Sequence, residues 1–206
     1  MSFLMNNKGG VIAIFLLVTL PFFIILLIVL PDMARFQEGV NTHLKNAVIQ
    51  STRTAASAVN IYSQAAGTPM IDPDRAHGFF MKTLQGALGL DENLSSLEGS
   101  RTEGQARYYF VVFNGQNDFV PSGKYFIFNG ETLESGELDF TDTEQRFYIQ
   151  EDRIILEPGE IEVIFKHPGV VSVVTIGSKP IYRNREEATR WAAARIEKNR
   201  KEVVVP

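Results

Sequence analysis

The sequence predicts an α+β protein, in which a long N-terminal transmembrane helix continues into an antiparallel β-sheet domain that ends with a C-terminal helix. Three observations predict this fold. Residues 11–30 form a charge-free apolar run of 20 residues, interrupted only by one Thr and one Pro. A helical apolar pattern follows it as far as Gly67, and short aromatic and β-branched segments separated by turns begin at Arg107.

The apolar run has the length of a membrane span. At about 1.5 Å of rise per residue it covers roughly 30 Å, the thickness of the hydrocarbon core of a bilayer. Val11 and Leu30 bound the run and Pro21 lies inside it. Because the run is longer than the apolar part of a signal peptide and no A-x-A follows it, we expect residues 1–31 to be an uncleaved tail and anchor. The single apolar run predicts one pass through the cell membrane, and Lys8 before it favours a domain outside the cytoplasm.

Residues 32–66 predict an extension of the same helix beyond the membrane, which ends at Gly67-Thr68-Pro69. One face of this extension is rich in small side chains, which let another helix or a sheet approach closely. This face consists of Leu44, Ala47, Ser51, Ala55 and Ala58. Two interpretations are open: the face packs beneath the protein's own domain, or it packs against copies of itself or partner subunits.

Residues 67–206 predict the α+β domain. Asp72-Pro73 is typical of a helix start, and Gly89 of its end. Strands are expected at 107–113, 124–128, 131–133, 145–149, 153–157, 160–166 and 170–176. Without helices between them, these strands predict an antiparallel sheet. Asn184 and Glu187 match a capping box, so a last helix is expected to bury Ala188, Trp191, Ala192 and Ile196. The tail, residues 202–206, is expected to add an edge strand.

Composition limits the chemistry. The 45% of hydrophobic residues indicate a folded domain, and the net charge of −4 disfavours nucleic acid as a partner. The chain has no cysteine, which excludes disulfides and thiolate chemistry. Its three histidines lack metal-ligand spacing, and the acidic residues 137–144 lack the spacing of an EF-hand and are interpreted as a solvated loop. We therefore expect no enzymatic activity, no cofactor and no metal site.

The N-terminal region resembles a known family. Lys8-Gly9-Gly10 before the apolar run, Pro21 within it and Ala55-Ala56-Ser57-Ala58 beyond it resemble the start of TadE/TadG-like proteins of tight-adherence pilus systems. The similarity covers about the first 65 residues. It implies leader processing after Gly9 or Gly10, whereas the pilin-like α+β plan is inferred from the order of the predicted helix and strands. Pilin-like members carry a Glu a few residues after the glycine, where this chain has Ile14 and Phe15, which favours an accessory subunit over a main one.

These observations lead to one main hypothesis and two alternatives. The main hypothesis is a membrane-anchored, non-enzymatic, pilin-like or pseudopilin-like accessory subunit of a tight-adherence/type IV-like pilus or secretion system. Its partners would be the lipid bilayer, other pilus or secretion-system subunits and copies of itself. The first alternative is a membrane-tethered extracytoplasmic ligand-binding or sensor domain, which predicts a concave apolar pocket with convergent polar groups. The second is an anchored enzyme, for which the sequence offers no site.

Overall fold

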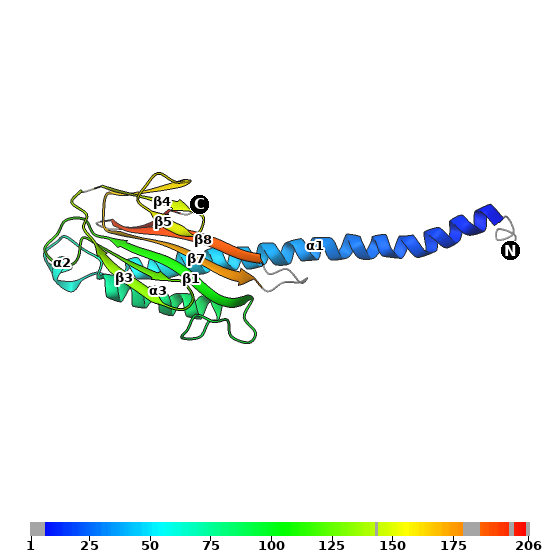
Figure 1. Cartoon of the computed structure of the whole chain (residues 1–206), viewed down its shortest axis with the longest axis horizontal. Coiled ribbons are helices and arrows are strands. Elements are labelled where there is room, and N and C mark those ends of the chain that lie inside the picture. Colours follow the sequence, from blue (N-terminus) through cyan, green and yellow to red (C-terminus); the bar gives the residue numbers. More distant parts are fainter. Residues whose placement is uncertain (1–6, 143, 179–185, 198–199, 205–206) are drawn as a thin grey trace. The chain divides into compact units, whose positions relative to one another are not determined.

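The computed structural model describes the backbone of residues 7–142, 144–178, 186–197 and 200–204, and side chains within 15–25, 27, 41–142, 144–177 and 187–196. The chain divides into two compact units, Met1–Gly39 and Val40–Pro206. Helix α1 (Asn7–Ala56) begins in the first unit and ends in the second. Two shorter helices, α2 (Ile61–Ala65) and α3 (Pro73–Leu88), belong to the second unit (Figure 1).

Two antiparallel sheets form the rest of the second unit. The larger sheet has the order β3-β2-β1-β7-β8-β9. Its strands are β1 (Thr102–Phe113), β2 (Gly123–Phe128), β3 (Leu133–Leu138), β7 (Gly169–Ser178), β8 (Glu186–Glu197) and β9 (Arg200–Val204). The smaller sheet has the order β5-β4-β6, from β4 (Gln145–Gln150), β5 (Arg153–Ile155) and β6 (Ile161–Phe165). The predicted antiparallel α+β domain is therefore correct.

The large sheet lies between two hydrophobic cores because its central strands are apolar on both faces. On β1, Phe110 and Val112 lie in the core shared with α1 and α3, whereas Val111 and Phe113 lie in the core shared with the small sheet. Figure 1 shows α3 on one side of the large sheet and β4 and β5 on the other. The second unit thus has three layers: helices, large sheet and small sheet.

The expected transmembrane helix is not found, and this part of the predicted fold class is wrong. Among the described residues, no helix combines the length and the apolarity that a membrane crossing requires. The expectation came from residues 11–30, which lie inside α1.

The predicted C-terminal helix is also wrong, because its residues form β8. Ala188, Ala192 and Ile196 pack in the core on the helix side of the sheet, and Trp191 packs in the core on the other side. Residues four apart share a face in a helix and also in a strand, where every second residue does. Trp191 alone distinguishes the two structures, because it would share the face of Ala192 in a helix but lies on the opposite face in a strand. The ten residue pairs between β8 and β7 show that this segment is a strand. The expected edge strand near the C-terminus is present as β9.

The helical extension ends earlier than the sequence predicted, at Ala56 and not at residue 66. Both the backbone N–H and the Oγ of Ser57 donate to the carbonyl of Thr54, which closes the last turn. Val59 then forms an isolated bridge with Ile71, and the Asn60 side chain caps α2 by accepting from two backbone N–H groups. The segment from Thr54 to Asn60, which consists mostly of small and polar residues, therefore forms a turn. The spacing of apolar residues had predicted that the helix continues through it.

The start and end of α3 follow the predicted signals. Asp72 accepts a hydrogen bond from the backbone N–H of Arg75 at 3.1 Å, and Pro73 occupies the first turn. Gly89 ends the helix in the left-handed conformation, at φ 65°. The helix buries Phe80, Leu84 and Leu88 against the large sheet.

Candidate interaction surfaces

The small-residue face of α1 is buried in the protein's own core. Leu44, Ala47, Ser51, Ala55 and Ala58 have between 0% and 3% of their surface exposed. Leu44, Ala47 and Ala55, with Ala58 just beyond the end of α1, share one hydrophobic core with α3 and the large sheet. The Ser51 hydroxyl donates to the carbonyl of Ala47. Of the two interpretations left open by the sequence, the structure favours packing beneath the protein's own domain. This face is not free to contact a partner in the folded unit.

A hydrogen bond between two buried hydroxyl groups joins α1 to the centre of the sheet. Thr52 Oγ1 and Ser172 Oγ, on β7, lie 2.6 Å apart, and both residues are fully buried. Thr52 Oγ1 also donates to the carbonyl of Val48 at 2.7 Å. Because buried hydroxyl groups are costly without partners, this pair fixes the position of the helix on the sheet.

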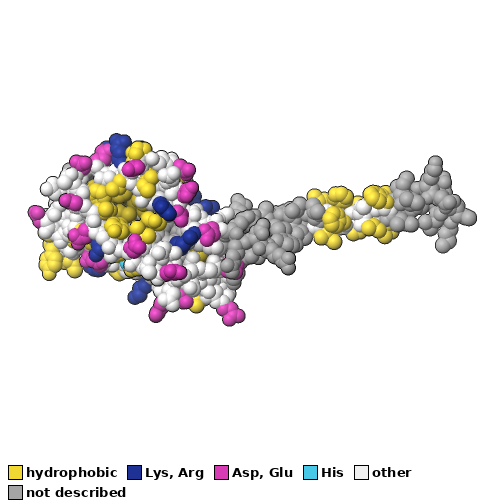
Figure 2. Space-filling model, in the orientation of Figure 1, with side chains coloured by type: hydrophobic (Ala, Val, Ile, Leu, Met, Phe, Trp, Pro, Cys, Tyr) yellow, Lys and Arg dark blue, Asp and Glu magenta, His cyan; other side chains and the backbone are white. Residues whose placement is uncertain are grey.

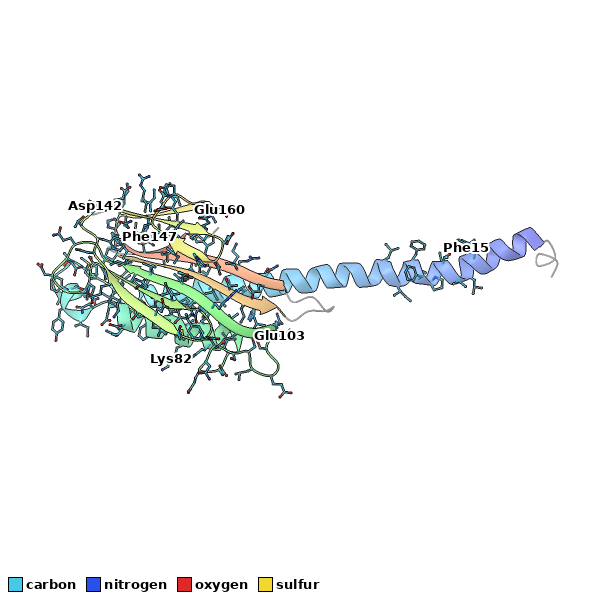
Figure 3. The ribbon with its side chains drawn as sticks, in the orientation of Figure 1. Phe15, Lys82, Glu103, Asp142, Phe147 and Glu160 are labelled. Atoms are coloured by element: carbon cyan, nitrogen blue, oxygen red, sulfur yellow. The ribbon has the colours of Figure 1, made fainter. Side chains whose placement is uncertain are left out.

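The N-terminal part of α1 carries apolar side chains that no described residue covers. Ten large apolar side chains there are 47–75% exposed. They are Phe15, Leu16, Leu17, Val18, Leu20, Phe22, Phe23, Ile24, Ile25 and Leu27. Figure 2 shows them as a yellow band on the helix, and Figure 3 labels Phe15. A continuous apolar surface of this kind marks an interaction site.

The other residues singled out from the sequence in this region are only partly described. Pro21 is exposed, within the apolar segment. Gly9, Gly10, Val11 and Leu30 lie in α1, but their side chains are outside the described residues. Leader processing after Gly9 or Gly10 therefore stays a prediction.

A second apolar surface lies between the two sheets. A groove of about 200 Å³ opens there, and its lining atoms are almost all apolar. The large sheet contributes Tyr109, Val111, Tyr125, Ile127 and Leu138, and the small sheet contributes Phe147, Ile154, Ile155 and Leu156. Figure 2 shows hydrophobic side chains gathered on this face of the domain, and Figure 3 labels Phe147.

The groove exists because the small sheet is too narrow to cover the large one. Strand β5 has only three residues and contacts β1 and β7, while Tyr125 of β2 and Leu138 of β3 pack against the second core and are only partly buried. On β2, Tyr125 lies over Gly136 of β3, so closely that a Cβ at Gly136 would fall 2.6 Å from the Tyr125 ring. The sequence pattern predicted β1 and β2 as strands of an antiparallel sheet, but it could not show a second sheet that covers one face only in part.

A larger open hollow, of about 450 Å³, lies near the end of β3 and includes Asn117, Glu137 and Asp139. The Asn117 side chain is already used in its own loop, where it accepts from the backbone N–H groups of Phe119 and Val120 at 2.9 Å. Among the described residues, no three His, Asp or Glu side chains gather closely enough to hold a metal ion. The polar Asn117 side chain in this hollow therefore stabilises its own loop.

A partly buried polar cluster lies between α3 and the large sheet. His77 Nε2 and the Tyr108 hydroxyl oxygen lie 2.7 Å apart, and the His77 ring stacks on Phe126 at 4.1 Å between centroids. Lys124 Nζ binds both carboxylate oxygens of Asp74, at 2.8 and 3.1 Å, at the edge of this cluster. Burial lowers the pKa of His77 to about 4, because it disfavours the charged ring more than Asp74 favours it. Burial also raises the pKa of Tyr108, so at neutral pH both groups are uncharged.

This cluster is a structural element of the core. Aromatic rings cover His77, and its polar contact is satisfied by Tyr108. No local sequence pattern indicates this pair, since the two residues are 31 positions apart. Only the packing of α3 on β1 brings them together.

Comparison with known proteins leaves the family resemblance untested. No family model, no curated protein and no solved structure matches the chain.

Proposed function

We propose that the chain is a non-enzymatic, pilin-like or pseudopilin-like accessory subunit of a tight-adherence/type IV-like pilus or secretion system. In this proposal the apolar segment of α1, residues 15–27, is covered by the corresponding helices of other subunits. The domain, residues 40–206, holds the end of the same helix in its own core. Location at the cell membrane, and on which side the domain lies, stay predictions.

The exposed apolar segment is the observation that carries this proposal. Ten large apolar side chains are at least 47% exposed within thirteen helical residues, 15–27. Burying one Leu, Ile or Phe side chain is worth about 1.5–3 kcal/mol. A segment with this much exposed apolar surface therefore binds strongly to any matching apolar surface, and a bundle of like helices provides one.

The difference between the buried C-terminal part of α1 and its exposed apolar segment supports the same function. The part from Leu44 to Ala56 is committed to the domain by small side chains that fit closely on the sheet. The part from Phe15 to Leu27 uses large side chains that nothing in the described domain covers. One helix thus supplies both the centre of a folded domain and a surface for assembly.

The test compares association of the full chain with that of two double variants. Leu17→Gln with Leu20→Gln alters the apolar segment, where these side chains are 75% and 58% exposed. Ile61→Gln with Leu97→Gln is the matched control, because these two apolar side chains of the domain are 69% and 51% exposed. Sedimentation velocity measures self-association, and crosslinking in cells that express a complete pilus locus identifies partner subunits.

We expect the helix variant to associate about a hundredfold more weakly, since it loses the burial of two leucines. The control should associate like the unaltered chain. A chain that is found only as a solitary monomer in both experiments refutes the proposal, and so does a helix variant that associates normally.

The groove favours a second candidate, a ligand-binding domain. Its concave apolar lining fits the expected pocket in part, but the groove lacks the convergent polar groups that orient most small ligands. Such a domain would bind an apolar ligand. Saturable binding of a fluorescent apolar probe that is lost in Ile127→Asp, with unchanged folding by circular dichroism, would favour this candidate.

A further inference from the structure

A smaller, polar hollow adjoins the apolar groove between the two sheets. Its volume is about 140 Å³. Tyr109 and Ile127 line both the groove and this hollow. These two residues lie directly opposite each other on β1 and β2. The groove and the polar hollow therefore meet at this pair, and we call the two together the inter-sheet site.

Both walls of the inter-sheet site change from charged to apolar in the same direction. Every second residue of a strand shares a face, so Arg107, Tyr109 and Val111 follow one another along β1. Arg107 lines the polar hollow and Val111 the groove. On β5, Arg153 lines the polar hollow and Ile155 the groove. Figure 2 shows Lys or Arg side chains beside the hydrophobic group on this face. A molecule that fits both walls is amphipathic, with its polar end at the arginines.

The two arginines have N–H groups to offer a ligand. The ion pair of Arg153 with Asp152 is long, 3.7 Å from Nε to Oδ1, and no described residue accepts a hydrogen bond from the Arg153 guanidinium. Arg107 uses Nη2 to donate to Glu187. A guanidinium has more N–H donors than one carboxylate uses, so each arginine can bind a further acid group.

The acidic groups beside the arginines favour a carboxylate over a phosphate. Asp152 lies in the lining of the polar hollow, and Glu187 pairs with Arg107. These two groups limit the negative charge that the hollow can accept. A phosphate group carries a charge of about −1.5 to −2 at neutral pH, so they repel it more strongly than they repel a carboxylate.

The groove itself favours an alkyl chain. Its lining atoms are almost all apolar. A peptide bound there would bury backbone N–H and C=O groups without partners, which is costly, whereas an alkyl chain has no such groups. Each CH₂ group that enters the groove strengthens binding about fourfold. The groove alone is smaller than the about 300 Å³ of a typical small-molecule site, but the polar hollow brings the whole site into that range.

We infer that the inter-sheet site binds a fatty acid, with its alkyl chain in the apolar groove and its carboxylate at Arg153 and Arg107. This inference rests on the second candidate function, the ligand-binding domain, and names the class of its ligand. It does not depend on assembly through α1. The polar groups that the groove lacks are supplied by the adjoining hollow, where they orient the ligand.

Photocrosslinking of the full chain locates the bound molecule. The probe is decanoate that carries a diazirine in its alkyl chain, and mass spectrometry identifies the labelled peptides. We expect label in residues 109–111, 125–127 or 154–156, and we expect unlabelled decanoate to displace it. Label confined to residues 15–27, the exposed apolar segment of α1, overturns the inference. Label that decanoate does not displace also overturns it.

Two matched leucine variants test the groove. Leu156→Asp places a charge in the groove lining, at a side chain that is 51% exposed. Leu97→Asp is the control, because Leu97 is also 51% exposed but does not line the groove. Leu156→Asp should raise the apparent Kd of the probe about tenfold, since it removes apolar contact with the alkyl chain. The control should bind the probe normally, and an equal loss in both variants overturns the inference.

Two matched arginine variants test the carboxylate. The unaltered chain should prefer decanoate to 1-decanol as competitor at the inter-sheet site. Arg153→Gln should reduce this preference about fivefold, the effect of one exposed ion pair. Arg101→Gln, at an exposed arginine that lines neither hollow, should leave the preference unchanged. An unchanged preference in Arg153→Gln overturns the inference.

These outcomes are separate from those of the proposed functions. Equal displacement by decanoate and 1-decanol rejects the fatty acid but leaves a domain that binds uncharged apolar molecules. A site that neither competitor reaches rejects the ligand-binding domain as well. None of these variants alters residues 15–27, so the sedimentation test of the subunit role is decided independently.

Discussion

Acidification should destabilise the domain through His77, one of the described residues whose pKa departs from its ordinary value. The folded protein keeps this ring neutral until the pH approaches its lowered pKa of about 4. In the unfolded chain the ring takes up a proton near pH 6.5. The contribution of His77 to the free energy of unfolding is therefore fully present above pH 6.5. It falls as the pH drops from 6.5 to 4 and does not change further below pH 4.

The magnitude follows from the size of the pKa shift. One pKa unit corresponds to about 1.4 kcal/mol, so the lowering from 6.5 to about 4 limits the whole effect to about 3 kcal/mol. Between pH 7 and pH 5 the expected loss is about 1–2 kcal/mol, after allowance for the partial exposure of the ring. Asp74 opposes this loss by favouring the charged ring, and Lys124 adds to it.

Urea denaturation of the full chain at pH 7 and pH 5 measures the effect. The control is His77→Gln, which retains a polar group near Tyr108 but does not titrate. Other groups titrate equally in both proteins, so the difference between their pH dependences isolates His77. If the variant loses as much stability on acidification as the unaltered protein, the reasoning about His77 is wrong.

Two further predictions concern close packing in the second unit. Thr52→Val should lower the free energy of unfolding by about 1–3 kcal/mol, because Ser172 loses its buried partner, and adding Ser172→Ala should recover part of this loss in urea denaturation. Gly177→Ala should lower the thermal midpoint, since the new Cβ would lie 2.6 Å from the Glu103 carbonyl oxygen and must displace the backbone, at about 1–3 kcal/mol. Gly86→Ala, on exposed helix with open space around it, should raise the midpoint by the equivalent of about 1 kcal/mol, and a fall there would contradict the helix assignment.

The strands were largely predictable because their local patterns are distinct. Residues 107–113, 124–128 and 170–176 all lie within observed strands, where β-branched and aromatic residues alternate between turns. The C-terminal strand β8 was not predictable in this way. Its alanines carry no preference for strand, and Ala188, Ala192 and Ile196 fit both periodicities, so pairing with β7 decided the outcome.

The candidate surfaces were harder to predict than the strands. The exposed apolar segment of α1 is visible in the sequence as residues 11–30, although the membrane crossing inferred from it was wrong. The groove depends on where β5 lies over the large sheet, and no local pattern specifies that. The strand order of the large sheet could not be predicted either, because its central pair, β1 and β7, joins segments that lie far apart in the sequence.

The shared use of α1 has a consequence for how the sequence tolerates change. The buried positions between Leu44 and Ala56 must fit closely against the sheet, so a larger side chain at any of them should cause misfolding before assembly begins. Positions 15–27 are constrained only by the surface that binds them in the assembly. They should therefore accept exchange among large apolar residues without destabilising the domain. Genetic screens for loss of assembly and for loss of protein abundance should therefore select different halves of one helix.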